Sequence, residues 1–204
     1  MAKLYFRYGT MDSAKTLNLL AVAHNYRKQG KRCVLMKPRL DDRFGSAEIK
    51  SRSGLEAQAD YLLDPDGTLP VDELRDLDCV LVDEAQFLSE TMIDQLRDLT
   101  VDHAVPVICY GLRTDFQARL FPGSRRLFEL ADSIEEVKVT CYHCGRKAVF
   151  NLRLVDGRGV FEGPQVQLGA DEKYVPVCWQ HYREQRKAWD AQHGGPREAS
   201  SDSV

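Results

Sequence analysis

Few stretches limit the possible folds of this chain as strongly as GTMDSAKT, residues 9–16. It nearly matches the phosphate-loop pattern G-x-x-x-x-G-K-[S/T], with Ala14 in place of the second glycine. A predicted strand (3–8) precedes it and a predicted helix (13–30), capped by Ser13, follows it. A phosphate loop requires this setting, because the helix N-terminus helps to hold the anion. We therefore predict a nucleotide-binding loop rather than a chance turn.

Each residue type in such a loop has a physical role. Backbone N–H groups point at the β-phosphate, Lys15 reaches the β- and γ-oxygens, and the Thr16 hydroxyl binds magnesium. Alanine is the smallest departure from glycine at residue 14. We expect it to be tolerated where φ is negative and to be costly where φ is positive or where phosphate must touch the backbone.

The strand and helix signals recur along the first two thirds of the chain. Apolar strands are predicted at RCVLMKP (32–38), DCVLVDEAQF (78–87) and VPVICYG (105–111). A helix is predicted over 89–99, with one apolar face made of Met92, Ile93, Leu96 and Leu99. Alternating strands and helices predict a mostly parallel sheet with helices on both faces. Its ligand crevice should lie beyond the carboxyl ends of the strands.

Two carboxylates, Asp83 and Glu84, end one of these strands. A strand in this position can deliver a carboxylate to the magnesium side of a phosphate loop. An isolated pair of this kind is more often a solvated strand end or a helix cap, so the interpretation depends on the loop upstream. Neighbouring strand residues point to opposite sides, and we therefore expect these two to have different roles.

From about residue 134 the pattern changes to short alternating strands, with Phe150, Leu152 and Leu154 on one face. This second unit contains two C-x-x-C/H knuckles, CYHC and CWQH. Three thiolates and one imidazole suit a closed, structural zinc site, with His143 the poorer ligand geometrically. The predicted ligands are Cys141, Cys144, Cys178 and His181.

Composition excludes some classes of protein. The formal net charge of -3 over 204 residues offers no basic surface for nucleic acid. No apolar run approaches the roughly 20 residues of a membrane span, so we expect no membrane partner and a cytoplasmic location. We predict a nucleotide-binding domain at 1–134, a zinc domain at 135–190 and a disordered tail at 191–204.

Several stretches together resemble one family, type II thymidine kinase, the bacterial and vertebrate-cytosolic type. They are LYFRYGTM, AKT, DDRFG, VLVDEAQF, CYGLRTDF, CYHCGRKA and KYVPVCWQHY, in collinear order over about residues 2–190. The resemblance implies a RecA-like α/β core and a zinc-bearing lasso domain that covers the nucleoside. It also implies transfer of the γ-phosphate of ATP to the 5′-hydroxyl of thymidine, giving dTMP, with homotetramers and feedback inhibition by dTTP.

The resemblance also assigns roles to residues. Glu84 becomes the catalytic base, Arg43 the arginine that stabilises charge at the transferring phosphoryl group, and Asp41 a magnesium-side carboxylate. The ATP contacts it implies are Gly9, Thr10, Met11, Asp12, Ser13, Ala14, Lys15, Thr16, Asp41, Asp83, Glu84, Ala85 and Gln86. The implied nucleoside contacts are Phe87, Leu112, Phe116, Phe121, Val166, Gln167, Leu168, Gly169 and Tyr174.

Two alternatives stay open at this stage. One is a zinc-ribbon ATPase that binds nucleic acid, which the charge balance disfavours. The other is a non-catalytic nucleotide-binding protein whose phosphate loop has degenerated at Ala14, which the retained Lys15, Thr16, Asp83 and Glu84 disfavour.

Overall fold

The computed structural model describes residues 1–39, 47–64, 66–165 and 173–194. The strands are β1 Leu4–Gly9, β2 Cys33–Pro38, β3 Glu48–Lys50, β4 Glu56–Gln58, β5 Tyr61–Leu63, β6 Cys79–Val82, β7 Val107–Leu112, β8 Ser133–Glu136, β9 Phe150–Val155, β10 Arg158–Val160 and β11 Lys173–Val177. The helices are α1 Lys15–Lys28, α2 Val71–Leu74, α3 Glu90–Asp102, α4 Pro122–Leu130 and α5 Trp179–His193, with a short 3-10 turn η1 at Ala85–Phe87.

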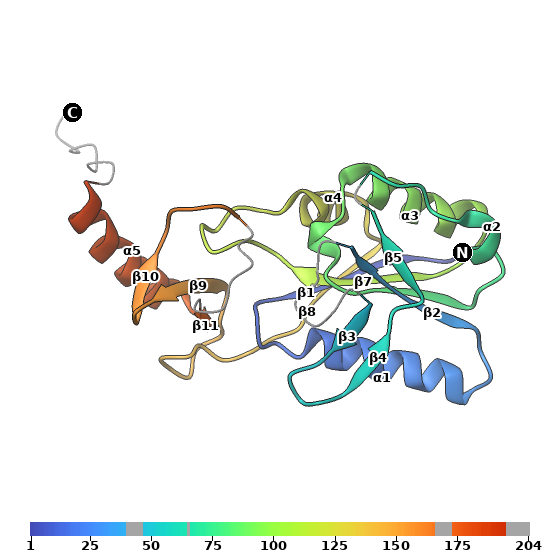
Figure 1. The fold of residues 1–204 in the computed structure, drawn as a ribbon, viewed down its shortest axis with the longest axis horizontal. Coiled ribbons are helices and arrows are strands. Elements are labelled where there is room, and N and C mark those ends of the chain that lie inside the picture. The colour runs from blue at the N-terminus through green and yellow to red at the C-terminus, as the bar shows by residue number, and fades with distance from the viewer. Residues whose placement is uncertain (40–46, 65, 166–172, 195–204) are drawn as a thin grey trace.

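A six-stranded sheet in the order β5-β2-β6-β7-β1-β8 forms the larger part of the molecule. All of its neighbouring strands pair in parallel. Helix α1 lies on one side of the sheet, and α3 and α4 lie on the other (Figure 1). The predicted α/β class, with a parallel sheet and helices on both faces, is confirmed.

Alternation along the strands divides the core into two clusters. Leu35, Leu81 and Ile108 point toward α1, where they pack with Leu19 and Ala23. The residues that alternate with them face α3 and α4, and the apolar face predicted for α3 packs there; this cluster includes Val80, Val82, Val107, Cys109, Met92, Ile93, Leu96 and Leu99. Because both faces are covered, the ligand site is left to the loops at the carboxyl ends of the strands.

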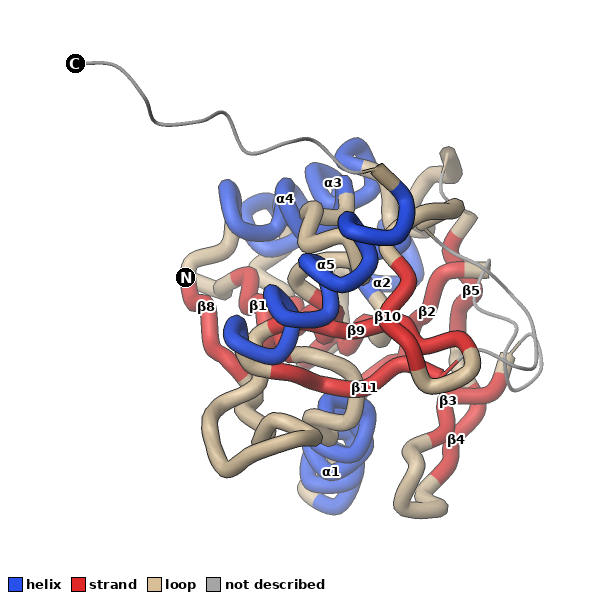
Figure 2. The backbone as a smooth tube through the Cα atoms, turned by 90° about the vertical axis from the view of Figure 1, so that its left-hand side faces the viewer, coloured by secondary structure: helices blue, strands red, loops and turns tan. Residues whose placement is uncertain are grey.

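The smaller unit is a three-stranded antiparallel sheet, β10-β9-β11, packed against α5. It lies beyond one end of the main sheet (Figure 1) and stands in front of that sheet when the molecule is viewed from this side (Figure 2). Its core contains Leu152, Val175, Val177 and Tyr182, and Phe150 and Leu154 pack against them. The face predicted from Phe150, Leu152 and Leu154 therefore packs in this core.

Three local expectations need correction or adjustment. Ser13 does not cap α1, because its hydroxyl is turned back to the carbonyl of Thr10 and Ala14 occupies the cap position. Strand β8 pairs with β1 and runs to Glu136, so the boundary expected between 134 and 135 falls inside a strand of the main sheet. Helix α5 continues to His193, three residues into the range assigned to the tail, and is capped by Gly194, which has a left-handed φ of 67°.

Within the described ranges, no helix has the length and apolar character needed to cross a membrane.

Candidate functional site

The phosphate loop joins β1 to α1 and is folded tightly on itself. A Cβ atom at Gly9 would lie 2.3 Å from Ser13 Oγ and 2.6 Å from the carbonyl oxygen of Val137, so glycine is required there. Ser13 Oγ donates a hydrogen bond of 2.8 Å to the carbonyl of Thr10. The loop thus has a defined shape before any ligand is considered.

Two loop residues that are not glycine have left-handed backbones. Asp12 has φ 63° and Ala14 has φ 60°. Alternating left-handed residues turn successive N–H groups toward one side, which makes an anion-binding nest. A left-handed alanine costs about 1–2 kcal/mol, so the condition under which Ala14 was expected to be costly applies here.

Lys15 is 8% exposed and curls over the loop. Its Nζ donates to the carbonyl of Thr10 at 2.7 Å and to Ser13 Oγ at 3.3 Å. The loop therefore holds a positive charge beside the N-terminus of α1, where the helix dipole also favours an anion.

Thr16 connects the loop to the acidic end of β6. Its hydroxyl lies 3.1 Å from Asp83 Oδ2 and 3.4 Å from Oδ1. Burial, and to a smaller extent the charge of Glu84, raise the pKa of Asp83 to about 7, although the hydrogen bond from Thr16 and the charge of Lys15 act in the opposite direction. A buried carboxylate next to a hydroxyl is a set of oxygen ligands that suits Mg²⁺.

Glu84 is not a strand residue, because β6 ends at Val82. Its φ of 50° is left-handed, and it begins the η1 turn. The alternation argument used to separate Asp83 from Glu84 therefore does not apply. Three of the six non-glycine residues with positive φ in the described chain are Asp12, Ala14 and Glu84, so backbone strain is concentrated at this site.

The turn that carries Glu84 is held from several sides. Gln86 Nε2 donates to Glu84 Oε2 at 2.5 Å, and Gln86 Oε1 accepts from the backbone N–H of Leu112 at 3.0 Å. A Cβ atom at Gly111 would lie 2.7 Å from Gln86 Oε1, and one at Gly123 would lie 2.6 Å from the carbonyl of Ala85. Two glycines thus allow β7 and α4 to pack closely against this turn.

The predicted nucleoside residues within the described chain form two aromatic contacts. The rings of Phe87 and Phe121 meet edge to face with centroids 5.6 Å apart. Those of Phe116 and Tyr174 lie 6.4 Å apart, which brings β11 of the small unit to the loop after β7. Leu112, at the end of β7, bonds to Gln86 as described above.

The predicted metal ligands lie together. One ligand atom from each of Cys141, Cys144, Cys178 and His181 falls within 4.8 Å of all the others. Nδ1 of His181 is 3.4 Å from Sγ of Cys141 and 3.3 Å from Sγ of Cys178, and the sulfurs of Cys144 and Cys178 are 3.9 Å apart. Tetrahedral zinc bonds to sulfur and nitrogen imply separations of about 3.8 Å between sulfurs and about 3.5 Å between sulfur and nitrogen.

The electrostatics of this cluster also favour a cation. Burial opposes ionisation of the Cys141 thiol, but backbone N–H groups of Cys178, His143 and Cys144 outweigh it and lower the pKa to about 6. The backbone N–H of His181 similarly lowers the pKa of Cys178. His143 is exposed and lies outside the four-residue group. The donor set therefore fits zinc.

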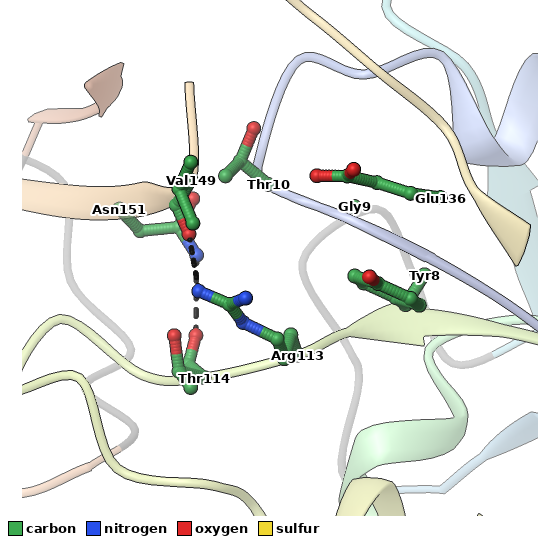
Figure 3. A pocket seen from close by; sticks show the side chains of 8 residues that line it. All are labelled: Tyr8, Gly9, Thr10, Arg113, Thr114, Glu136, Val149 and Asn151. Atoms are coloured by element: carbon green, nitrogen blue, oxygen red, sulfur yellow. Dashed lines mark hydrogen bonds between the residues drawn. The ribbon is translucent and has the colours of Figure 1, made fainter. Parts of the chain in front are cut away.

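A small pocket lies between the phosphate loop and the smaller unit, which also carries the four predicted metal ligands. It is lined by Tyr8, Gly9, Thr10, Arg113, Thr114, Glu136, Val149 and Asn151 (Figure 3). Arg113 Nη2 donates to the carbonyl of Val149 at 3.0 Å, and Asn151 Nδ2 donates to the carbonyl of Thr114 at 3.2 Å (Figure 3). The two units of the molecule are therefore joined by hydrogen bonds at this pocket.

Sequence reasoning missed the buried polar residues of β9. Asn151 and Arg153 are 3% and 5% exposed, and the guanidinium carbon of Arg153 lies 5.0 Å from the centre of the Phe116 ring. They alternate with the apolar face, so each could have been taken for a solvated strand residue. The available signal was the position of β9 in the chain, between the two knuckles. When the knuckles come together, the polar face of β9 is covered as well as its apolar face.

Some predicted site residues lie outside the described ranges. They are Asp41, Arg43, Val166, Gln167, Leu168 and Gly169.

Comparison with known proteins adds independent information. The family model described as thymidine kinase matches residues 2–182. Thymidine kinases from Lactiplantibacillus plantarum and Lactococcus lactis are each 44% identical to the chain, covering 89% of it and 96% and 97% of themselves. A thymidine kinase from Streptococcus thermophilus is 46% identical over 89% of this chain and 94% of its own. The chain belongs to the thymidine kinase family.

Proposed function

We propose that this protein transfers the γ-phosphoryl group of ATP to the 5′-hydroxyl of thymidine, with the loop and turn described above as its catalytic centre. The observation that carries the proposal is the hydrogen bond of 3.1 Å between Thr16 and Asp83. It joins the phosphate loop to the acidic end of β6, which is the pairing that phosphate-loop enzymes use for phosphoryl transfer. Family membership supplies the substrate.

In this mechanism the loop positions ATP. Backbone N–H groups of the loop, other than that of Met11, which donates to Asn151, surround the β-phosphate. Lys15 leaves its internal partners to contact the β- and γ-oxygens. Thr16 and Asp83 would hold Mg²⁺, which when bound neutralises the charge that develops between the β- and γ-phosphates. Ala85 and Gln86, which follow Glu84, are also assigned to contacts with ATP.

Glu84 is the proposed general base. It accepts the proton of the 5′-hydroxyl as that oxygen bonds to the γ-phosphorus and the bond to the β-γ bridging oxygen breaks. Gln86 orients its carboxylate through the 2.5 Å hydrogen bond. Arg43 is assigned to charge stabilisation and Asp41 to the magnesium side, both from their positions in the DDRFG stretch.

Flat apolar walls suit a pyrimidine base. We assign this role to Phe87, Leu112, Phe116, Phe121 and Tyr174, which come from the end of β7, η1, the loop before α4 and β11. Main-chain groups of 166–169 are assigned to the thymine edge. The contact between Phe116 and Tyr174 supports a pocket that the small unit helps to close.

The zinc proposed at Cys141, Cys144, Cys178 and His181 has a structural role. All four positions are taken by protein donors, so no open position remains for a substrate. It would fix the first knuckle to the beginning of α5. Bound zinc supplies folding free energy to a unit whose own apolar core is small.

Further features are proposed from family membership. They are homotetramers, feedback inhibition by dTTP, a cytoplasmic location, and a division into a nucleotide domain, a lasso domain and a tail. Sedimentation of the purified chain and titration of the kinase reaction with dTTP would test the first two.

A direct assay tests the function. Purified protein with full zinc content is incubated with Mg-ATP and with thymidine, deoxyuridine, deoxycytidine or deoxyguanosine. We expect phosphate transfer to thymidine. A folded protein that hydrolyses ATP only when single-stranded DNA is added would instead support a nucleic-acid-dependent ATPase.

A further inference from the structure

The side chain of Asn151 reaches from the zinc unit to the backbone of the phosphate loop. Its Oδ1 accepts a hydrogen bond of 2.8 Å from the N–H of Met11, across 140 positions of sequence. Its Nδ2 donates to the carbonyl of Thr114 at 3.2 Å. Asn151 is 3% exposed, so its amide group is shielded from water.

The bond to Met11 lies next to the strained part of the loop. Asp12 and Ala14 both have left-handed backbones, which cost about 1–2 kcal/mol each for residues that are not glycine. Such conformations persist only when surrounding contacts hold them. A hydrogen bond from the residue directly before Asp12 to the buried Asn151 side chain is a contact of this kind, and it also fixes the direction of one N–H group of the loop.

Asn151 is in turn fixed by the metal cluster. It pairs in register with Pro176 on β11, and Cys178 begins the second knuckle immediately after that strand. The carbonyl of Pro176 accepts from the N–H of Tyr142 in the first knuckle at 2.8 Å. The strand segment opposite Asn151 is therefore bonded to one knuckle and continuous with the other.

We propose that Asn151 is a positioning residue for nucleotide binding, through which the zinc unit holds the phosphate loop in its anion-binding shape. In this arrangement the zinc unit contributes to the ATP side of the reaction as well as to the nucleoside side. Asn151 acts through Met11 and touches no reacting atom. The inference rests on the proposed function only in taking a nucleotide as the ligand of the loop.

A neutral residue suits this position. A carboxylate at 151 would bring a negative charge beside the phosphates of the nucleotide and would lose the donor to Thr114. An alanine would leave the N–H of Met11 without its partner. With alanine, the loop could bind phosphate only after its strained conformation was restored without support from the small unit.

The test is the affinity of the zinc-loaded full chain for ADP with Mg²⁺, measured by calorimetry. Asn151→Ala should weaken binding roughly tenfold or more, as expected for the loss of a buried hydrogen bond. Steady-state kinetics should show a raised KM for ATP with the KM for thymidine unchanged. Hydrogen exchange of residues 9–16 should become faster while zinc content stays at the parental value.

Gln117→Ala is the matched control. Gln117 Nε2 also donates across the two units, to the carbonyl of Phe161 at 3.0 Å, but it does not contact the phosphate loop. It should lower stability without changing the affinity for ADP. If both variants weaken ADP binding equally, the effect belongs to general attachment of the small unit, and the proposal is overturned.

Should Asn151→Ala lose zinc, Asn151→Leu carries the test, because leucine is similar in size to asparagine but cannot accept the hydrogen bond from Met11. With full zinc content, it should also bind ADP more weakly, and unchanged affinity would refute the positioning role. ADP binding needs no thymidine turnover. If Asn151→Ala weakens ADP binding but the parent protein phosphorylates no thymidine, only the proposed function is refuted.

Discussion

The phosphate loop and the cluster of three cysteines and one histidine are both formed at turns, but the loop is shaped by its backbone and the cluster by its side chains. The loop depends on backbone conformation: Gly9 admits no side chain, and Asp12 and Ala14 have left-handed φ values. The zinc cluster depends on side chains, with four donor atoms within 4.8 Å of one another. The first is therefore sensitive to any added Cβ atom or altered φ, and the second to the identity of four residues.

The two regions also differ in how they obtain stability. The loop joins β1 to α1, and both elements pack in the main core, so the sheet fixes the two ends of the loop. The cluster lies in a small unit with a short antiparallel sheet and one helix. Small units of this kind commonly need a metal to fold. Changes to the cluster should therefore alter folding most, and changes near the loop should alter catalysis most.

The largest effect is expected from Cys141→Ser. Removing one thiolate should strip most of the zinc, because it takes away one of the four donors of a site that, when intact, supplies about 10–16 kcal/mol of folding free energy. The small unit should then lose its structure while the main sheet stays folded. Metal analysis and near-ultraviolet circular dichroism measure both effects. His143→Ala is the control, since His143 lies in the same knuckle but outside the cluster, and it should keep full zinc.

Glu84→Gln should give the next largest effect, and on turnover rather than on folding. Loss of a general base typically lowers kcat by about 10²–10⁴-fold. Glutamine retains an oxygen that can accept from Gln86, so the turn should keep its shape. Steady-state kinetics with thymidine and Mg-ATP measure the change, with the exposed Glu90→Gln as a control. Equal losses in kcat and in nucleoside affinity would reject the assignment as base.

Asp83→Asn should change how stability depends on pH. Burial raises the pKa of Asp83 to about 7, so the folded state keeps a proton that the unfolded state releases near pH 4. The contribution of this carboxyl to stability is therefore complete below about pH 4 and is lost as pH rises through about 7. The asparagine variant does not titrate and should gain stability relative to the parent over that range.

Calorimetric unfolding at pH 5 and pH 8, without nucleotide or magnesium, checks this prediction. Asp132→Asn provides a contrast of opposite sign, because hydrogen bonds from Arg97 and from the backbone N–H of Leu4 lower the pKa of Asp132. The ionised Asp132 carboxylate therefore stabilises the folded protein above its ordinary pKa, and this stabilisation is lost as pH falls. Replacing Asp132 should destabilise the protein at neutral pH. Parallel pH profiles for the two variants would contradict both assignments.

The sequence predicted the parallel sheet, the loop's place between β1 and α1, and the four residues of the metal cluster. These features follow from local patterns: apolar periodicity, a spaced glycine and lysine, and paired knuckles. Asn151 could not be predicted in the same way. Its partners Met11 and Thr114 come from distant segments, and only the packing of two units brings them together.

The conformations of single residues were also beyond the sequence. Ser13 looked like a helix cap, but its hydroxyl instead closes the loop on Thr10, which leaves Ala14 at the cap position. Glu84 looked like a strand residue, yet the strand ends at Val82 and a left-handed turn follows. In both cases the competing arrangement uses tertiary contacts that a local pattern does not contain.

The smallest effect is expected from Ala14→Gly. This variant measures how much stability the protein loses by having alanine where the loop pattern has glycine. Ala14 is exposed and has φ 60°, so glycine should relieve strain. The gain is reduced by the greater freedom of glycine in the unfolded chain, leaving about 1 kcal/mol, or a rise in Tm of about 2–4 °C. Ala104→Gly is the matched control, because Ala104 is exposed, has φ 56° and lies far along the chain from the loop.

Both glycine variants should be stabilised by similar amounts in thermal unfolding. Because the loop already has its left-handed shape with alanine, Ala14→Gly should leave kcat and the KM for ATP unchanged, as Ala104→Gly should. Ala14 would then lower stability without lowering activity, and the contacts around the loop would hold its strained conformation. An inactive parent restored by Ala14→Gly would instead mean that the phosphate loop has degenerated, and the contrast between a strained but competent loop and a metal-dependent unit would fail.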